Sequence, residues 1–398
     1  MRIVHIIDFF HPSAGYQLNV LSKYIVKQGH EDYIVTGELK KVPKSLIDFF
    51  GNEQINELDE NYEKYTGVKI IRLPLKAYIS GRAIFNSSLE KTVDNLKPDI
   101  LFIHDIDTFV GIQFILRINK LKYPVVFNST MLEMASMNPF RKQFRWFYKK
   151  FVTPKIIKFQ LKSIRIQDDN YLEKCLGIPI SQCPFISVGS DTMLFQPNDI
   201  VKQKFREKYN LSKDDFVVIY TGKLVESKGA KLLAETFKEK LQNKKNINIV
   251  LIVVGNTSGE YGQEIEELFN KSENRIIRFP TQKYMDLAQY YQAADLSVFP
   301  KECSLSFYDA QACGLPVLSE DNNVNVDRLK YNNGFTFHAG DKHDFRKKII
   351  KCIEMDQIDF NYMEESAYKF VKNNYDYEDI AKRYIQVLVE EYKKFYSR

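Results

Sequence analysis

The sequence predicts an α/β protein made of two doubly wound domains, each built on a parallel sheet. Short apolar segments alternate with amphipathic segments of helical period along both halves of the chain, and this alternation is typical of parallel sheets that helices cover on both faces. The length of 398 residues exceeds what one ordinary hydrophobic core serves. We therefore expect one domain over residues 1–190, a second over 191–375 and a terminal helix over 376–398.

The first domain is expected to contain six strands, all of them short apolar runs. They lie at 3–7, 32–36, 69–73, 99–103, 124–128 and 183–187. Apolar residues also recur at helical spacing through Leu18, Leu21 and Ile25, and Gly29 marks the end of that helix. Two further helices are expected at 83–96 and 108–120.

The second domain follows the same alternation. Its expected strands lie at 216–221, 248–254, 275–279, 295–299 and 316–319, and its expected helices at 229–242, 260–271, 283–293 and 341–353. The final segment is amphipathic, with Ile380, Tyr384 and Leu388 on one face. Two such domains bind a ligand in the cleft between them, outside the carboxyl ends of the strands.

Composition and charge restrict the class of protein and its compartment. The net charge of +6 is compatible with phosphate-bearing ligands or an anionic surface, and it does not indicate nucleic-acid binding. The five cysteines have neither metal-ligand spacing nor a paired framework, which favours a reducing compartment and predicts no metal site. The apolar start of the chain contains Asp8 and is interpreted as a strand, not a signal peptide. No apolar run reaches membrane-spanning length, so we expect a cytoplasmic protein, with peripheral attachment to the inner face of the membrane as an option.

The most informative stretch is FPKECSLSFYDAQACGLPVL, residues 299–318. An expected strand ends at Pro300, the carboxylate of Glu302 follows, and a short helix carries a second carboxylate, Asp309. The helix ends at Gly314, and Pro316 opens the next strand. In a parallel sheet this order brings both acids to the carboxyl ends of strands, where ligands bind.

This stretch resembles the donor-sugar motif of the retaining glycosyltransferases of family 4, in which two glutamates separated by seven residues precede a run of small residues. The resemblance covers nearly the whole chain, through the stretches DFFHPSAGYQLNVLSKYIVKQGHEDYIVT, PDILFIHD, GIPISQCPFISVGSDTMLFQP, YTGKLVESKGAKLLAETF and YDYEDIAKRYIQVLVEEY. It implies the GT-B fold, in which two Rossmann-like domains face each other across a cleft and the C-terminal helix crosses back to pack on the N-terminal domain.

Two lysines are the expected diphosphate clamp. Gly222 and Lys223 end one strand, and Lys228 opens the next helix. Two cations five residues apart beside a helix start can hold a pyrophosphate and stabilise the charge that grows on it. The family usually has Arg at the first position, so Lys223 lacks the bidentate fork. Without the resemblance, two lysines in such a loop would be interpreted as ordinary solvated residues.

The acids of the motif have roles that the resemblance implies. Asp309 stands where the family's second glutamate grips the ribose. The family spacing counted back from Asp309 reaches Lys301, so either the loop has lost one residue and Glu302 contacts the sugar, or the position has changed. The first alternative is preferred, and a surface role for Glu302 competes with it. Further donor contacts are expected from the backbone at Ser304, Leu305 and Ser306 and from the glycine-rich turn that begins at Gly255.

The N-terminal domain is expected to contribute a glycine loop and polar strand ends. Gly15 lies in the loop before the first helix, where a residue without Cβ lets the backbone approach the donor. The family often has a His after the strand corresponding to 124–128, but Asn128 stands there. His104 and His11 could line the same cleft, although a single His at a strand end is more often structural.

A basic aromatic segment runs from residue 140 to 162, FRKQFRWFYKKFVTPKIIKFQLK. It has eight Lys or Arg, no acid and the only Trp of the chain, Trp146. Two interpretations are equally favoured: an amphipathic segment on an anionic bilayer, with its aromatic rings at the headgroups, or a helix packed on the N-terminal sheet with solvated lysines.

The first functional hypothesis is a metal-independent, retaining glycosyltransferase that needs no cofactor beyond its nucleotide-sugar co-substrate. A UDP-sugar is the favoured donor, and a cell-envelope glycan or lipid-linked precursor is the expected acceptor. The second hypothesis is a catalytically weak GT-B protein that binds a glycan or another transferase, because the usual His is absent and the first acid is displaced.

Overall fold

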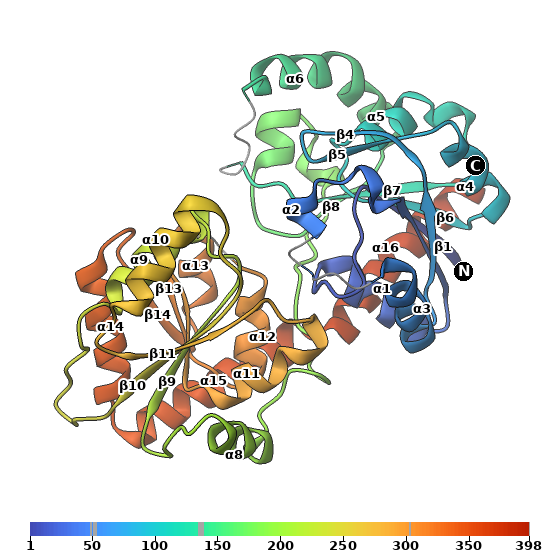
Figure 1. Ribbon diagram of the computed structural model, residues 1–398. Helices are drawn as coiled ribbons and strands as arrows, with labels where there is room; N and C mark the ends of the chain where they lie inside the picture. The colour runs from blue at the N-terminus through green and yellow to red at the C-terminus, as the bar shows by residue number, and fades with distance from the viewer. Residues whose placement is uncertain (48–49, 51–53, 134–138, 302–303, 398) are drawn as a thin grey trace. The chain divides into compact units, whose positions relative to one another are not determined.

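The computed structural model describes residues 1–47, 50, 54–133, 139–301 and 304–397. The chain forms two compact units: unit 1 comprises 1–188 and 377–398, and unit 2 comprises 189–376. The sequence placed these divisions at 190/191 and 375/376. Each unit has one six-stranded sheet, and helices lie on both faces of it (Figure 1).

The sheet of unit 1 has the strand order β3-β2-β1-β6-β7-β8, and every neighbouring pair is parallel. The strands are β1 (Arg2–Ile7), β2 (Glu31–Gly37), β3 (Lys69–Leu73), β6 (Ile100–Ile103), β7 (Val125–Ser129) and β8 (Ser163–Arg165). The central strands are apolar on both sides; all four residues of β6 are buried, as a parallel sheet between two helical layers requires.

Unit 1 also contains two layers of helices and a separate β-hairpin. The helices are α1 (Gln17–Lys27), α2 (Lys44–Ile47), α3 (Ile55–Thr66), α4 (Ser88–Leu96), α5 (Phe109–Leu116), α6 (Arg141–Phe147) and α7 (Thr153–Phe159), with α16 (Tyr377–Tyr396) from the end of the chain. The hairpin consists of β4 (Leu75–Ile79) and β5 (Arg82–Phe85), which are antiparallel. The core between the sheet, α4, α5 and α7 is aliphatic and aromatic.

The sheet of unit 2 has the order β11-β10-β9-β12-β13-β14 and is also parallel throughout. Its strands are β9 (Phe216–Thr221), β10 (Ile249–Val254), β11 (Arg275–Phe279), β12 (Leu296–Phe299), β13 (Val317–Glu320) and β14 (Gly334–Phe337). Its helices are α8 (Asp199–Lys208), α9 (Ala230–Thr236), α10 (Gly259–Asn270), α11 (Ala288–Ala293), α12 (Ser306–Ala312), α13 (Asn323–Arg328), α14 (Lys342–Glu354) and α15 (Gln357–Asn374). The predicted fold class, two doubly wound α/β domains, is confirmed.

Three predictions of local structure are wrong. Residues 183–187 form no strand: Phe185 makes only an isolated bridge to Arg165, and the sixth strand of unit 1 is the short β8. The helix expected at 83–96 starts only at Ser88, because 82–85 is the second strand of the hairpin. The helix expected at 229–242 ends at Thr236.

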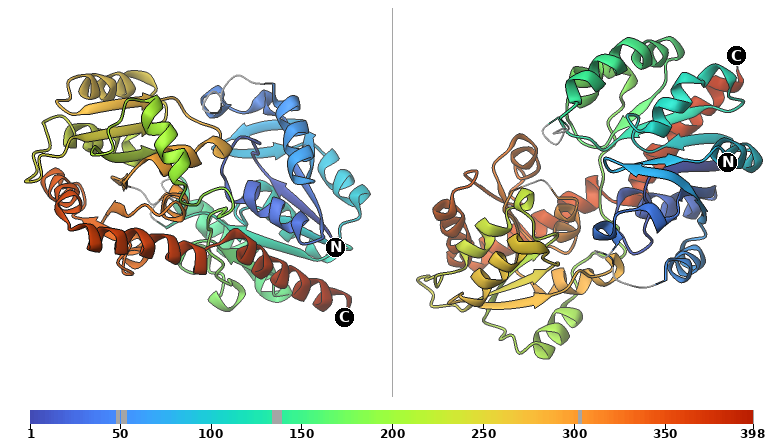
Figure 2. Two further views of the ribbon diagram at one scale, coloured as in Figure 1. Left: turned by 90° about the horizontal axis from the view of Figure 1, so that it is seen from below. Right: turned by 45° about the horizontal axis from the view of Figure 1, so that its top comes forward.

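The terminal helix α16 packs within unit 1. Its predicted apolar residues Ile380, Tyr384 and Leu388 are buried. The Gln17 amide on α1 donates to the Tyr384 hydroxyl, and the Tyr384 hydroxyl donates to the backbone carbonyl of Ile186 over 3.3 Å. Figure 2 shows α16, in dark red, lying along unit 1.

Candidate functional site

Two glycines bring the strand ends of unit 2 close together. Gly222 follows β9 with φ 143°, and Gly255 follows β10 with φ 155°, both in the region that favours glycine. A Cβ on Gly255 would lie 1.9 Å from the carbonyl oxygen of Gly222. The amide of Gly222 donates to Val254 over 3.0 Å. Any other residue at 255 would force these two loops apart, so this carboxyl edge is tightly shaped.

Lys223 and Lys228 lie near each other at this edge. Both are partly buried, and Lys228 ends the 3₁₀ turn Glu226–Lys228 before α9. Burial lowers the pKa of the Lys223 ammonium, and the neighbouring charge of Lys228 lowers it further. The sequence expectation that these lysines form a pair is consistent with this mutual repulsion, which a bound anion would relieve.

A third lysine borders the same loop. A Cβ on Gly229 would lie 2.9 Å from the Cβ of Pro300 and 3.1 Å from the Cβ of Lys301. Gly229 has φ 74°, so it is fixed as glycine both by its conformation and by this close approach. Lys301 is exposed. Glu302 lies outside the described residues, so the choice between a shortened loop and a changed position stays open.

Asp309 is buried inside unit 2 on α12. Its Oδ1 accepts hydrogen bonds from the Ser190 hydroxyl over 2.7 Å and from the Tyr284 hydroxyl over 3.3 Å. Burial raises the pKa of its carboxyl to about 7, although both hydrogen bonds lower it. The backbone amides expected at the start of α12 are partly used: Ser306 N–H donates to Ser304 Oγ over 3.2 Å, and Leu305 precedes the helix as its N-cap.

A change of Asp309 to Asn tests whether this carboxyl is neutral. A folded pKa raised above the ordinary value means that the acid stabilises the fold below pH 4 and loses this contribution as pH rises through about 7. The Asn amide oxygen keeps both hydrogen bonds and carries no charge. We expect Asp309→Asn to come close to the wild type near pH 4 and to exceed its free energy of unfolding increasingly as pH rises, by at least roughly 2 kcal/mol at pH 8, measured by urea unfolding. A variant that is less stable at pH 8 would contradict this.

Unit 1 has a charged cluster at the carboxyl edge of its sheet. Asp8 follows β1, and Asp105 and Asp107 follow β6. The Arg82 guanidinium on β5 lies 2.9 Å from Asp105, 3.5 Å from Asp107 and 3.9 Å from Asp8. The sequence reasoning placed Asp105 near the cleft but missed Arg82, Asp8 and Asp107, although acids placed soon after apolar strands were a readable signal.

One guanidinium faces three carboxylates in this cluster, and two of the three are difficult to ionise. Burial raises the pKa of Asp8 to about 7 against the lowering effect of Arg82, and it raises the pKa of Asp107. Asp105 has φ 63°, an uncommon conformation for a residue with a side chain. Its Oδ1 accepts from the amide and the hydroxyl of Thr130 over 2.8 and 2.7 Å.

His104 and Asn128, which were expected in the cleft, belong to a buried chain of hydrogen bonds. Asn128 Nδ2 lies 3.1 Å from His104 Nδ1, His104 Nε2 lies 3.0 Å from His5 Nδ1, and His5 Nε2 lies 2.9 Å from Asp32. An amide nitrogen can only donate, so His104 Nδ1 accepts from Asn128. His104 Nε2–H then donates to His5, and His5 Nε2–H donates to the Asp32 carboxylate. Asn128 also accepts from the backbone amide of Asp105 over 2.8 Å. This series of hydrogen bonds therefore fixes the loop that carries Asp105.

The loop before α1 is compact. His11 is buried, its Nδ1 accepts from the Ser13 amide over 3.2 Å, and its ring stacks on Phe50 with centroids 4.4 Å apart. Gly15 lies two residues before the start of α1 and is partly buried.

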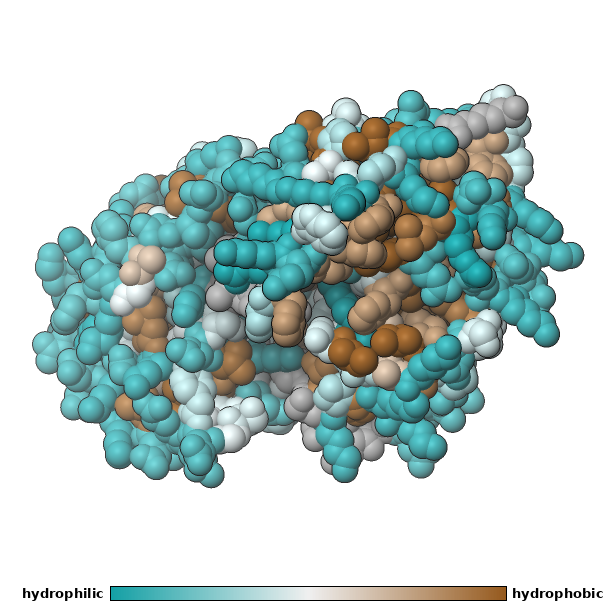
Figure 3. Space-filling view, turned by 90° about the horizontal axis from the view of Figure 1, so that it is seen from above, coloured by the Kyte–Doolittle hydropathy of each residue, from teal (hydrophilic) through white to brown (hydrophobic). Residues whose placement is uncertain are grey.

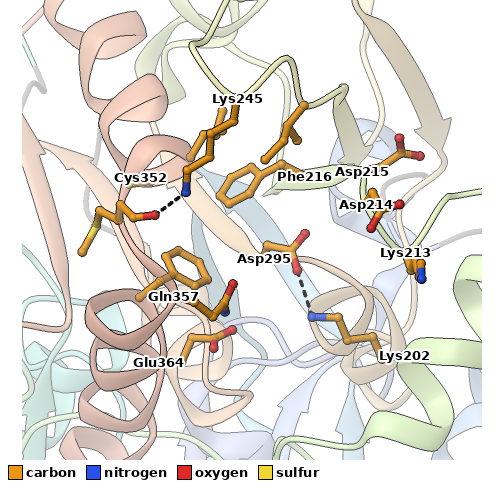
Figure 4. Close-up of a pocket in the computed structure, with 14 residues that line it drawn as sticks. Lys202, Lys213, Asp214, Asp215, Phe216, Lys245, Asp295, Cys352, Gln357 and Glu364 are labelled. Carbon is orange, nitrogen blue, oxygen red and sulfur yellow. Dashed lines mark hydrogen bonds and ion pairs between the residues drawn. The ribbon is translucent and has the colours of Figure 1, made fainter.

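A cavity of about 460 Å³ in unit 2 lies elsewhere (Figure 4). It is lined by Phe216 at the first residue of β9 and by Asp295 just before β12. It therefore opens at the amino ends of the strands, opposite the edge that carries Gly222 and Gly255. Asp295 is held by Lys202 over 2.8 Å and by Arg206 over 2.6 Å. We do not assign the donor to this cavity, because ligands of such sheets bind at the carboxyl ends.

Within the described ranges, no three His, Cys, Asp or Glu side chains are arranged to hold a metal ion. In the same part of the chain, no helix combines the length and apolar character needed to cross a bilayer.

Residues 201–377 match the family described as glycosyl transferases group 1. A probable sucrose-phosphate synthase of Thermosipho melanesiensis is 26% identical over 214 residues, 52% of this chain and 47% of that protein. The capsular polysaccharide biosynthesis glycosyltransferase CapM of Staphylococcus aureus is 27% identical over 177 residues, 43% of this chain and 45% of that protein. The matches thus span about half the length of these curated relatives.

The fold of the whole chain is also found among solved structures. Anabaena HepE, in its complex with UDP-glucose, has a TM-score of 0.71 and 16% sequence identity, covering 98% of this chain and 100% of that one. The likeness identifies the fold as GT-B, as the sequence implied.

Proposed function

We infer that this chain, whose residues 201–377 match the glycosyl transferases group 1 family, transfers a sugar from a nucleotide-diphosphate sugar to an acceptor. The observation that carries the proposal is the carboxyl edge of unit 2. There Gly222 and Gly255 leave backbone without side chains, and Lys223 and Lys228 supply two neighbouring ammonium groups. A diphosphate is the kind of anion that two neighbouring ammonium groups beside a helix start would bind.

The proposed donor is a UDP-sugar, bound without a metal ion. UDP-glucose in the structure of HepE, a protein of the same fold, supports the choice of base. As the sugar leaves, charge accumulates on the diphosphate, and the proposed role of Lys223 and Lys228 is to stabilise that charge in the transition state. The resemblance of 299–318 to the motif of family 4 supports retention of the anomeric configuration. Glu302 keeps its proposed contact with the sugar.

The proposed role of Asp309 at the ribose is restricted by its surroundings. Both of its hydrogen bonds to protein end on Oδ1. A ribose hydroxyl would therefore meet Oδ2, and a protonated carboxyl could donate there. Because the side chain is buried, with 6% of its surface exposed, this contact requires the ribose to lie directly against α12.

The proposed acceptor side is the cluster in unit 1. Carboxyl groups and a guanidinium at strand ends can bind the hydroxyl groups of a sugar. Burial raises the pKa of Asp8 to about 7, and a carboxyl that holds its proton can both donate and accept. The capsular polysaccharide enzyme among the relatives supports a cell-envelope glycan or a lipid-linked precursor as the acceptor class. We place the proposed reaction in the cytoplasm, at the inner face of the membrane.

A thermal-shift panel tests the proposal. UDP, GDP, ADP and TDP are added separately, with Mg²⁺ and with a chelator. A ligand at 100 times its dissociation constant stabilises the fold by about 2.7 kcal/mol, and we expect UDP to produce such a shift equally in both conditions. A shift with a different diphosphate would replace the base, and a shift only with Mg²⁺ would overturn metal independence.

A catalytically weak GT-B protein is the second candidate. Lys301 at the position that the family spacing gives to an acid, and the engagement of Asp309 with Ser190 and Tyr284, favour it. UDP binding without hydrolysis or transfer from UDP-glucose, UDP-galactose or UDP-N-acetylglucosamine would select this candidate over the enzyme.

A further inference from the structure

The basic aromatic segment is helical and firmly attached to unit 1. It consists of α6, a π-helical turn over Tyr148–Val152 and α7. Tyr148, Val152 and Ile156 are completely buried. The Tyr148 hydroxyl donates to the carbonyl of Ile106 over 3.0 Å, and the Thr153 hydroxyl donates to the carbonyl of Leu176 over 2.6 Å. One side of the segment is therefore fixed to the core, as one of the two sequence interpretations required.

The other side exposes large apolar side chains. The exposed fractions are 70% for Phe140, 61% for Trp146, 47% for Phe151 and 37% for Phe147. Three of these rings lie together: the centroids of Phe147 and Phe151 lie 5.5 Å apart, and those of Trp146 and Phe151 lie 6.1 Å apart. We call Phe140, Trp146, Phe147 and Phe151 the aromatic face. Packing on the sheet explains the buried side of the segment but not this face, since a contiguous apolar surface in water is costly.

The charges that the segment itself carries are all positive. The segment has eight Lys or Arg and no acid. The Lys150 ammonium lies 5.0 Å from the ring centroid of Trp146 and 5.5 Å from that of Phe151. Lys142 and Lys149 of the same segment are exposed. Figure 3, seen from the side on which α6 lies in Figure 1, shows apolar atoms in brown among hydrophilic teal on this side of unit 1.

We propose that the aromatic face and its basic rim dock unit 1 on the surface of an anionic lipid bilayer. Aromatic rings that lie beside polar or cationic groups insert favourably at the level of the lipid headgroups. The lysines are attracted by the negative surface potential of acidic lipids. A protein partner would also need to be acidic over the same area, but it would not need four rings that insert. The inference deepens the proposed action on a lipid-linked acceptor, yet its test needs no transfer activity.

The chain provides its own probe, because Trp146 is its single tryptophan. The full chain is titrated with vesicles of phosphatidylglycerol and phosphatidylcholine, and separately with pure phosphatidylcholine vesicles, while tryptophan emission and co-sedimentation are followed. We expect a blue shift of the emission and quenching by brominated lipids with the anionic vesicles only. Binding should weaken at least tenfold between 50 mM and 500 mM salt, because screening reduces the attraction.

Variants separate the rings from the charges. The double variant Phe147→Ser, Phe151→Ser removes two rings, keeps the tryptophan and should reduce vesicle partitioning at least tenfold. The double variant Lys142→Glu, Lys149→Glu reverses two charges and should reduce it by a similar factor. Ile358→Ser is the matched control, since Ile358 is 82% exposed on α15 in unit 2 and should leave partitioning unchanged. Thermal unfolding verifies that each variant is folded. No emission change with anionic vesicles, or unchanged partitioning of both double variants, would overturn the proposal. If the protein bound anionic vesicles but transferred no sugar, the membrane-docking proposal would stand and only the proposed transferase activity would be refuted.

Discussion

Replacement of Lys228 by alanine is expected to reduce sugar transfer at least about 100-fold while leaving the fold intact. The side chain lies on a turn at the carboxyl edge of unit 2 and is only partly buried, so its loss removes little packing. Deletion of one preorganised group that stabilises transition-state charge typically costs about 10² to 10³ in kcat. Steady-state kinetics with UDP-sugar, or its slow hydrolysis when the acceptor is unknown, measure the effect.

The effects of replacing Lys223 and Lys228 are expected to be coupled, so both single variants and the double variant are measured. The charge of Lys228 lowers the pKa of Lys223, so removal of Lys228 makes Lys223 a stronger cation that partly compensates. The double variant, in which neither lysine can compensate, should therefore lose more than the sum of the two single effects in free energy. Lys231→Ala is the control, since Lys231 lies on α9 in the same part of the chain but pairs with Glu264 over 2.6 Å. Near-normal turnover of the double variant would refute the clamp.

The fold was largely readable from the sequence because buried parallel strands leave an uninterrupted apolar signal. β9, β10 and β11 were predicted to within a residue. The failures have local causes. β8 has only three residues, too few to show a period. The apolar residues of 183–187 have another cause: Cys183 and Ile186 are buried in unit 1, although their segment makes only an isolated bridge to β8.

The site of unit 2 was more predictable than that of unit 1. Gly222, Lys223 and Lys228 follow one strand directly, so a sequence motif contains them. Arg82 meets Asp8 and Asp105 only because a hairpin folds across the edge of the sheet, and the sequence around residue 83 has the composition of a helix. The burial of Asp309 against Ser190 was also unreadable, since the two residues are 119 positions apart.

The charged cluster of unit 1 gives the largest expected effect on stability. Arg82→Met keeps most of the apolar stem and removes the only cation that faces Asp8, Asp105 and Asp107 within the ion pairs of the described residues. Removing one partner of a buried ion pair typically costs about 3 to 5 kcal/mol, because the remaining charge is left uncompensated. The Arg82 side chain is 24% exposed, so we expect roughly 3 kcal/mol at pH 8. Arg117→Met, which removes a half-exposed guanidinium paired with Glu90, should cost less than about 1 kcal/mol.

The dependence of this loss on pH distinguishes charge from packing. Burial raises the pKa of Asp8 to about 7, and Arg82 holds it below the value that burial alone would give. Without Arg82 the pKa of Asp8 rises further, so the acid binds its proton over a wider range in the folded state than in the unfolded one. A raised pKa contributes stability that is complete below about pH 4 and is lost as pH rises through the folded value. The variant should therefore be close to the wild type at pH 5 and fall progressively behind between pH 6 and pH 8, as urea unfolding at each pH would measure. If the variant lost the same free energy of unfolding at pH 5 and at pH 8, Arg82 would stabilise the fold through its packed apolar stem. The electrostatic role proposed for the cluster would then be wrong.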